Sequence, residues 1–217
     1  MISIVKNKIY PTWNELYKNS NVFDLPWVSK DIHPVLKQVI DNLPMKKGVA
    51  LDVGCGLGQV SRYLAQVGFR TTGIDISDEA ISLCDKLNNT GKQINYQVAN
   101  SITFNSKEKF DLIIDFLHIH DIERENIEQY LKNIEKLLSK NGYLIISTFS
   151  QNDKSNKNTN VRKSNFVQQN INYYSKHEIL NLLVNEYIIV NNKSLTVGKN
   201  DESYKSYILI LKRKYNE

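Results

Sequence analysis

The stretch Val49-Ala-Leu-Asp-Val-Gly-Cys-Gly-Leu-Gly-Gln59 decides the fold that we expect for this chain of 217 residues. Its first five residues form a short, mainly apolar run between glycines, which is typical of a buried parallel strand. Gly54, Gly56 and Gly58 follow at alternate positions, and apolar residues at helical spacing come after them. Glycine has no Cβ atom, so this turn lets the backbone approach a ligand closely, and the helix start presents free N–H groups. The stretch therefore predicts a strand, a glycine turn and a helix that bind a nucleotide-like ligand.

Two acidic residues flank this glycine turn and indicate which ligand it binds. Asp75 ends a second predicted strand, residues 70–74, where a carboxylate can accept hydrogen bonds from both ribose hydroxyls. Asp52 stands two residues before the first glycine, where it would repel the phosphates of a dinucleotide or triphosphate. The sulfonium and ammonium groups of S-adenosylmethionine suit this acid. The glycine spacing also differs from the Gly-x-Gly-x-x-Gly of dinucleotide sites.

The motifs resemble those of a known enzyme family. Leu51-Asp-Val-Gly-Cys-Gly-Leu-Gly58, followed by Gly73-Ile-Asp-Ile-Ser77, is similar to motifs I and II of class I S-adenosylmethionine-dependent methyltransferases. The resemblance extends over roughly residues 30–212. It implies an α/β, Rossmann-like fold with seven mostly parallel strands flanked by helices, the last strand being antiparallel. It also implies a methyltransferase whose cofactor is S-adenosyl-L-methionine.

The expected cofactor site follows from these motifs. We expect Asp75 to hold the ribose, Ile76 to pack on the adenine, and residues 100–102 to meet the edge of the base. Class I methyltransferases often have an acid where this chain has Asn100, whose amide oxygen can still accept a hydrogen bond from the adenine amine. The residues expected to bind the cofactor are Asp52, Gly54, Cys55, Gly56, Gly58, Asp75, Ile76, Asn100, Ser101, Ile102 and Asp115.

Candidate catalytic residues lie in the tetrapeptide His118-Ile-His120-Asp121, directly after a predicted strand at residues 110–117. Ligands of open parallel sheets bind beyond the carboxyl ends of the strands, so the tetrapeptide is well placed. His118, His120 and Asp121 are the candidates for a general base, which an amine or hydroxyl acceptor would need. A His-x-His pair followed by an acid also suits a metal, and the third alternative is a pocket wall. We expect no metal.

The N-terminal segment is rich in aromatic residues and is predicted to form a lid, residues 1–30, on a methyltransferase domain, residues 31–217. Aromatic faces favour a sulfonium and apolar acceptors. The alternative is that these residues simply pack on the domain. Trp13 and the later Pro26-Trp27 also resemble the front end of thiopurine-, thiol- and tellurite-type methyltransferases, which implies a small, polarizable acceptor. The residues expected to contact the substrate are Tyr10, Trp13, Tyr17 and Trp27.

Composition limits the partners that we expect. The chain has 28 basic and 23 acidic residues, a net charge of +5. Residues 152–165 carry much of the excess in a polar segment that is predicted to be a mobile loop, so nucleic acid is an unlikely partner. No apolar run of membrane-spanning length and no signal peptide are found, and the two cysteines do not indicate a disulfide. We expect a cytoplasmic monomer or homodimer.

The predicted function is methyl transfer to a small molecule carrying a thiol, amine, hydroxyl or metalloid. A methyltransferase acting on RNA or protein is the alternative. A dinucleotide-dependent oxidoreductase is disfavoured by Asp52 and by the glycine spacing.

Overall fold

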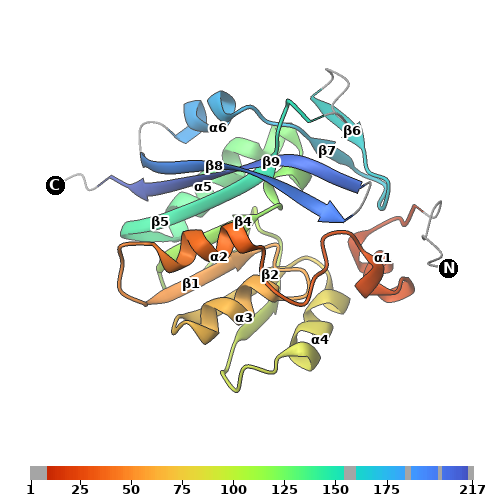
Figure 1. Cartoon of the computed structure of the whole chain (residues 1–217), viewed down its shortest axis with the longest axis horizontal. Helices are drawn as coiled ribbons and strands as arrows, with labels where there is room; N and C mark the ends of the chain where they lie inside the picture. Colours follow the sequence, from red (N-terminus) through yellow and green to blue (C-terminus); the bar gives the residue numbers. More distant parts are fainter. Residues whose placement is uncertain (1–8, 154–159, 184–186, 200–201, 215–217) are drawn as a thin grey trace.

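A sheet of seven strands, covered by helices on both faces, forms the centre of the molecule (Figure 1). The computed structural model describes residues 9–153, 160–183, 187–199 and 202–214, and its strand order is β3-β2-β1-β4-β5-β9-β8. Neighbouring strands run parallel except at β9, which is antiparallel to both β5 and β8. The expected fold class is confirmed. The strands are β1 (Val49–Val53), β2 (Arg70–Asp75), β3 (Asn95–Val98), β4 (Phe110–Phe116), β5 (Leu138–Phe149), β8 (Tyr187–Lys199) and β9 (Glu202–Arg213).

Alternate residues of the central strands bury opposite faces of this sheet. In β4, Leu112 and Ile114 pack with α2 and α3, whereas Ile113 packs with α5 and α6. Cover on both faces is what a parallel sheet requires, and it explains why β1 and β4 are mainly apolar. No helix in the described part of the chain is long and apolar enough to cross a membrane. The helices are α1 (Trp13–Asn19), α2 (Pro34–Asp41), α3 (Gln59–Gln66), α4 (Asp78–Leu87), α5 (Ile127–Leu137) and α6 (Lys176–Leu183).

The predicted helix starts coincide with side-chain caps. The Ser77 hydroxyl accepts the Ala80 N–H at the start of α4. At α6, Glu178 N–H donates to Ser175 Oγ at 3.0 Å, and Ser175 N–H donates to a Glu178 carboxylate oxygen at 2.7 Å. Each such cap satisfies backbone donors that the first turn of a helix leaves free.

The C-terminal strands are longer than the sequence indicates. We expected strands at residues 187–190 and 204–211, but β8 continues to Lys199 and pairs with β9 along its whole length. The extension of β8 is polar because this strand forms the edge of the sheet. The loop expected at residues 150–165 contains a strand, β6 (Val161–Lys163), which pairs with β7 (Asn170–Asn172). Residues 154–159 of this loop lie outside the described residues, so the predicted mobility of the loop stays a prediction.

The N-terminal segment is fixed to the chain that precedes β7. Tyr10 N–H donates to the Phe166 carbonyl at 2.8 Å, and Gln168 N–H donates to the Tyr10 carbonyl at 2.9 Å. Leu16 of α1 is buried in the same cluster as Val167 and Ala80 of α4. The segment therefore lies over the carboxyl ends of the parallel strands, between α4 and β7 (Figure 1). The predicted domain division at residue 30 stays a prediction.

Candidate functional site

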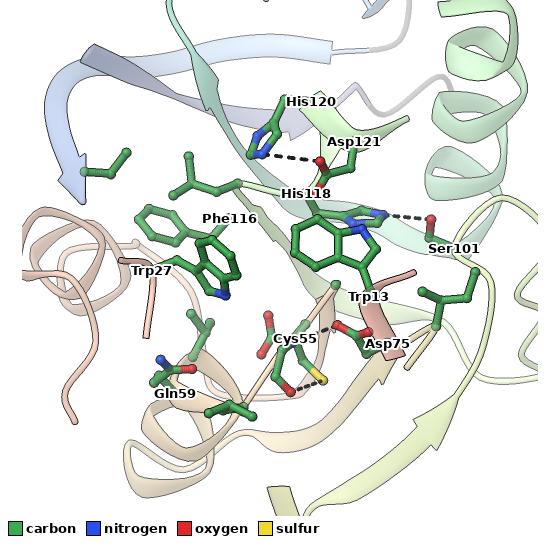
Figure 2. A pocket seen from close by; sticks show the side chains of 18 of the residues that line it. Trp13, Trp27, Cys55, Gln59, Asp75, Ser101, Phe116, His118, His120 and Asp121 are labelled. Atoms are coloured by element: carbon green, nitrogen blue, oxygen red, sulfur yellow. Dashed lines mark hydrogen bonds and ion pairs between the residues drawn. The ribbon is translucent and has the colours of Figure 1, made fainter. Parts of the chain in front are cut away.

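One continuous cavity of about 660 Å³ lies where β1, β2 and β4 end, under the N-terminal segment. This volume is in the range of small-molecule sites. Figure 2 shows the glycine turn and Asp75 on one side, with Trp27, Phe116 and His120 on the other. The predicted site residues that line it are Asp52, Gly54, Cys55, Gly56, Asp75, Ile76, Asn100, Ser101, Ile102, His118, His120, Asp121, Trp13, Tyr17 and Trp27.

The glycine turn has a conformation and surroundings that exclude side chains. Gly54 has φ +64°, and a Cβ atom there would lie 2.5 Å from His118 Nδ1. L-residues rarely adopt such positive φ values. The histidine after β4 therefore packs directly on the turn after β1. These two predicted site segments are brought into contact by the parallel pairing of β1 and β4.

Asp75 joins the glycine turn to the second strand. Gly56 N–H donates to Asp75 Oδ2, and Ser77 N–H donates to Asp75 Oδ1, both at 2.9 Å. Each carboxylate oxygen has a second lone pair, so both can still accept a ligand hydroxyl. Burial raises the pKa of this carboxyl.

Asp52 is the second buried acid beside the glycine turn. It is buried at the end of β1, accepts a hydrogen bond from Ser61 Oγ at 2.5 Å, and burial raises its pKa to about 7. A buried carboxylate with a hydroxyl partner and no cation beside it is stabilised when a cationic ligand arrives. Asp52 and Asp75 together make this side of the cavity acidic, which fits the ammonium, sulfonium and ribose of S-adenosylmethionine.

The expected adenine side of the cavity is formed by loop residues after β2 and β3. Ile76 lines the cavity although 57% of its surface is exposed, so a flat ligand can pack on it. Asn100 Oδ1 already accepts the Ile102 N–H at 2.9 Å, which leaves one lone pair on this oxygen and its NH₂ group for a base. Ser101 Oγ lies 2.8 Å from His118 Nε2 and thus faces the histidine.

Three predicted site residues do not line the cavity. Gly58 lies behind the turn, where a Cβ atom would be 2.5 Å from the Tyr96 hydroxyl. Tyr10 is buried beside β7, and its hydroxyl donates to the Asn19 carbonyl. Asp115 is fully buried and accepts hydrogen bonds from His118 N–H, Ile119 N–H and the Tyr130 hydroxyl. Gly58 is enclosed by neighbouring side chains, and the polar side-chain atoms of Tyr10 and Asp115 are hydrogen-bonded within the protein. Ligand contact by these three residues stays a prediction.

The predicted catalytic tetrapeptide forms a short turn, η2 (Ile119–Asp121). His118 is edge-on to the Tyr130 ring, with 5.8 Å between the ring centroids. Leu117, which precedes His118, has φ +65°. The Asp115 carboxylate accepts hydrogen bonds from the N–H groups of His118 and Ile119. The backbone of the turn therefore fixes where the His118 imidazole lies.

His120 and Asp121 form a buried polar pair. His120 is 6% exposed and stacks on Phe149 at 4.2 Å, and its Nε2 lies 3.7 Å from Asp121 Oδ1. Asp121 Oδ1 also accepts a hydrogen bond from Gln169 Nε2 at 3.0 Å. Burial lowers the pKa of His120 to about 3 and raises that of Asp121, so both favour their neutral forms. Within the described ranges, His120 Nδ1 has no hydrogen-bond partner, and no three His, Cys, Asp or Glu side chains form a metal cluster.

Aromatic side chains close the cavity from the N-terminal side. Trp27 Nε1 donates to the Tyr17 hydroxyl at 3.2 Å, and this hydroxyl lies 3.3 Å from where a Cβ of Gly56 would be. Trp27 also meets Trp13 and Phe166 edge to face, at centroid distances of 5.6 and 4.8 Å. Tyr17 thus covers the glycine turn, whereas Trp27 covers the opposite side.

Sequence reasoning missed the far wall of the cavity. We define the acceptor compartment as the part lined by Trp27, Phe116, His120, Phe149, Arg162, Phe166 and Tyr204. Phe149, Arg162 and Phe166 come from the end of β5 and the segment around β6, and Tyr204 comes from β9. No motif marks them, because only the pairing of distant strands brings them together.

Residues 29–186, most of the chain, match the profile of the methyltransferase domain family. The chain belongs to the class I S-adenosylmethionine-dependent methyltransferases. It is 30% identical over 138 residues to the ubiquinone biosynthesis O-methyltransferase of Pelagibacter ubique, a match that covers 63% of this chain and 57% of that protein. This methyltransferase uses S-adenosylmethionine, and the family excludes the alternative of a dinucleotide-dependent oxidoreductase.

Solved structures share the fold of this methyltransferase. A Methanosarcina mazei SAM-dependent methyltransferase has a TM-score of 0.72 at 21% identity, over 86% of this chain and 100% of that one. The 1,6-didemethyltoxoflavin-N1-methyltransferase of Burkholderia thailandensis was solved with bound 1,6-didemethyltoxoflavin and S-adenosylhomocysteine. It has a TM-score of 0.64 at 20% identity, over 84% of this chain and 78% of that one.

Proposed function

We propose that this methyltransferase methylates a small, flat molecule that binds in the acceptor compartment. The observation that carries the proposal is the continuous cavity, which is acidic at the glycine turn and aromatic at its other end. A concave compartment with aromatic walls suits a small ring system better than RNA or a folded protein. The Pelagibacter relative named for ubiquinone biosynthesis and the Burkholderia enzyme with bound 1,6-didemethyltoxoflavin support a small-molecule acceptor.

The residues around the glycine turn would hold the cofactor. Asp52 would meet the ammonium group, Asp75 the ribose hydroxyls, and Ile76 the adenine, with Asn100–Ile102 at the edge of the base. When bound, S-adenosylmethionine supplies a methyl group that is already activated on a sulfonium. Trp13, Tyr17 and Trp27 would exclude water from this group, and the rest of the chain's task is orientation.

Proton transfer, where the acceptor needs it, is assigned to the buried pair. The ionised Asp121 carboxylate would accept the proton of an acceptor hydroxyl or amine, and its raised pKa makes it a stronger base than an exposed carboxylate. His120 would position this carboxylate from 3.7 Å. His118, held by Ser101 and the glycine turn, would form the boundary between the two parts of the cavity.

The proposed function is tested by measuring S-adenosylhomocysteine release with thiols, amines, phenols and metalloid oxyanions as acceptors. Calorimetry with S-adenosylhomocysteine, in the wild type and in Asp75→Ala, tests the cofactor site separately. Asp75→Ala removes charge-assisted hydrogen bonds, so we expect at least a tenfold loss of affinity, a change of about 1.4 kcal/mol. Unchanged affinity would contradict the cofactor assignment, and methylation only of RNA or protein would contradict the acceptor class.

A further inference from the structure

Arg162 is a cation in the wall of the acceptor compartment. It lies in β6, and its Nε donates to the Tyr173 hydroxyl at 3.0 Å. The guanidinium carbon lies 5.4 Å from the centroid of the Tyr204 ring. Two aromatic side chains therefore hold the guanidinium group at the cavity, and the Nη groups are left to donate elsewhere.

No carboxylate of the described residues forms an ion pair with Arg162. The other arginine near this side of the sheet, Arg124, is paired with Glu178 at 3.1 Å, whereas Arg162 has a hydroxyl and a ring as partners. A cation that is partly removed from water without an anion is unfavourable, and an anionic ligand would compensate it. The acids that line the cavity do not supply a negative charge to Arg162. Asp121, for example, accepts its hydrogen bond from Gln169 and not from Arg162.

Arg162 also acts on the polar end of the compartment. Burial is the main cause of the lowered pKa of His120, and the charges of His118 and Arg162 add to it. The positive charge of the guanidinium group therefore acts on His120, which lies 3.7 Å from Asp121. A ligand that reaches this pair from the glycine turn comes within range of Arg162.

We propose that Arg162 binds a carboxylate of the methyl acceptor, so that the substrate is a flat aromatic carboxylic acid. A planar guanidinium matches a carboxylate with two parallel hydrogen bonds, and the neighbouring Phe149 and Tyr204 rings match a flat ring system. A single unpaired cation suits a monoanion better than a phosphate dianion. This inference rests on the proposed function and makes its acceptor class narrower.

The test measures binding to the full chain saturated with S-adenosylhomocysteine. The probes are 2-naphthoate and indole-3-carboxylate, each compared by calorimetry with its uncharged primary amide. The only two tryptophans of the chain, Trp13 and Trp27, both line the cavity, so intrinsic fluorescence provides a second readout. We expect the wild type to bind at least one carboxylate at least tenfold more tightly than its amide.

Variants assign this preference to one side chain. Arg162→Gln should abolish the preference for the carboxylate over the amide. Arg162→Lys should retain only part of this preference, because an ammonium group cannot make the two parallel hydrogen bonds of a planar guanidinium. Lys30→Gln removes another cation of the cavity wall and should keep the preference. Tyr173→Phe keeps the guanidinium but removes its hydroxyl partner, so it should weaken carboxylate binding without changing amide binding.

Three results would overturn the proposal. They are the absence of a carboxylate preference in the wild type, an unchanged preference in Arg162→Gln, and a loss of S-adenosylhomocysteine affinity in Arg162→Gln. The last result would assign Arg162 to the cofactor's own carboxylate. Failure of the proposed function is distinguishable, because S-adenosylhomocysteine would then fail to bind the wild type or no small acceptor would be methylated.

Discussion

At the scale of single residues, two buried acids have different tasks in the same cavity. Asp52 lies at the glycine turn with Ser61, and Asp121 lies at the acceptor compartment with His120 and Gln169. Burial raises the pKa of both. The buried Asp52 carboxylate would be stabilised by a cationic ligand, whereas the raised pKa of Asp121 makes it easier for this carboxylate to take up a proton.

The first prediction concerns Asp52→Asn. The pKa of Asp52 rises from 3.8 to about 7 on folding, so the folded state binds the proton more tightly. The free energy of unfolding is therefore highest below the unfolded pKa, falls as the pH rises toward about 7, and levels above it. Asparagine carries no charge at any pH, so the variant does not lose stability as the pH rises. Without ligand at pH 8, its free energy of unfolding should exceed that of the wild type by up to about 4 kcal/mol.

The same substitution should weaken S-adenosylhomocysteine binding at least tenfold, because the ammonium group loses its partner. Urea unfolding at pH 5 and pH 8, with calorimetry, measures both effects. Asp31→Asn, an exposed acid of the cavity wall, is the matched control and should change neither. A variant that is less stable at pH 8 and binds normally would show that Asp52 is ionised and has another partner.

The second prediction concerns Asp121→Asn. The amide oxygen can still accept the hydrogen bond of Gln169, but it cannot take up a proton. Turnover with a hydroxyl or amine acceptor should fall on the order of 100-fold, while S-adenosylhomocysteine affinity stays within about twofold. Because the base must be ionised, wild-type activity should rise with pH through the raised pKa of this carboxyl. A pH-independent rate with full activity in the variant would leave Asp121 as a wall residue.

At the scale of elements, the turn after β4 is held by a buried carboxylate. Asp115 binds two N–H groups of this turn and the Tyr130 hydroxyl of α5. It therefore ties the strand, the turn and the helix together, and it places His118 without touching the cavity.

The third prediction follows from these contacts. Tyr130→Phe removes one hydrogen bond to Asp115 and should lower the free energy of unfolding by about 1–3 kcal/mol. Asp115→Ala leaves two backbone donors and a tyrosine hydroxyl unpaired, so the loss should be larger, and turnover should fall because His118 is displaced. Urea unfolding and steady-state kinetics measure the two effects. Equal stability of both variants and the wild type would show that the turn is held by its own backbone.

The fourth prediction concerns the N-terminal segment as a lid. Residues 10–30 contact the rest of the protein through one apolar cluster, the Tyr10–Val167 pairing and the hydrogen bonds that Asn14 accepts from Ser77 and Glu79. The sheet has a continuous hydrogen-bond ladder, so we expect this segment to open more readily than the sheet. Hydrogen exchange of this segment should slow when S-adenosylhomocysteine binds, because Tyr17 covers the glycine turn. Exchange in α6, which lines no part of the cavity, is the internal control. Equal exchange with and without ligand would leave the segment as a structural cover.

At the scale of the whole molecule, the ligand should stabilise one cooperative unit. The cavity is lined by residues of the N-terminal segment, of six strands of the sheet and of the segment around β6, so a bound ligand joins all of them. S-adenosylhomocysteine at 100 times its dissociation constant should raise the free energy of unfolding by about 2.7 kcal/mol. The fifth prediction is that Asp75→Ala removes at least about half of this rise at the same concentration, because a tenfold loss of affinity leaves about 1.4 kcal/mol; thermal unfolding measures it. A rise that survives the substitution would place the ligand elsewhere.

The sequence predicted those parts of the molecule whose signals are local. The glycine turn, Asp75 and the tetrapeptide at His118 each follow a parallel strand, and the strand ends meet by topology alone. Arg162 and Tyr204 could not be found in this way, because their positions depend on the pairing of β6 with β7 and of β9 with the distant β5, which no motif marks. The hydrogen bonds that Asp115 accepts from the turn and from Tyr130 were not predicted, because alternation along β4 shows which face a residue is on but not its partners.

The pairing of Tyr10 with Val167 has a consequence for how the protein is made. Val167, which anchors the N-terminal segment, lies more than 150 residues downstream of Tyr10, and ribosomes add about 5–20 residues per second. The segment thus leaves the ribosome on the order of ten to thirty seconds before its docking partner. In a nascent chain that already contains the complete glycine turn, the N-terminal segment is not yet docked over the cavity. Biosynthesis therefore delays methyl transfer until the last third of the chain has emerged.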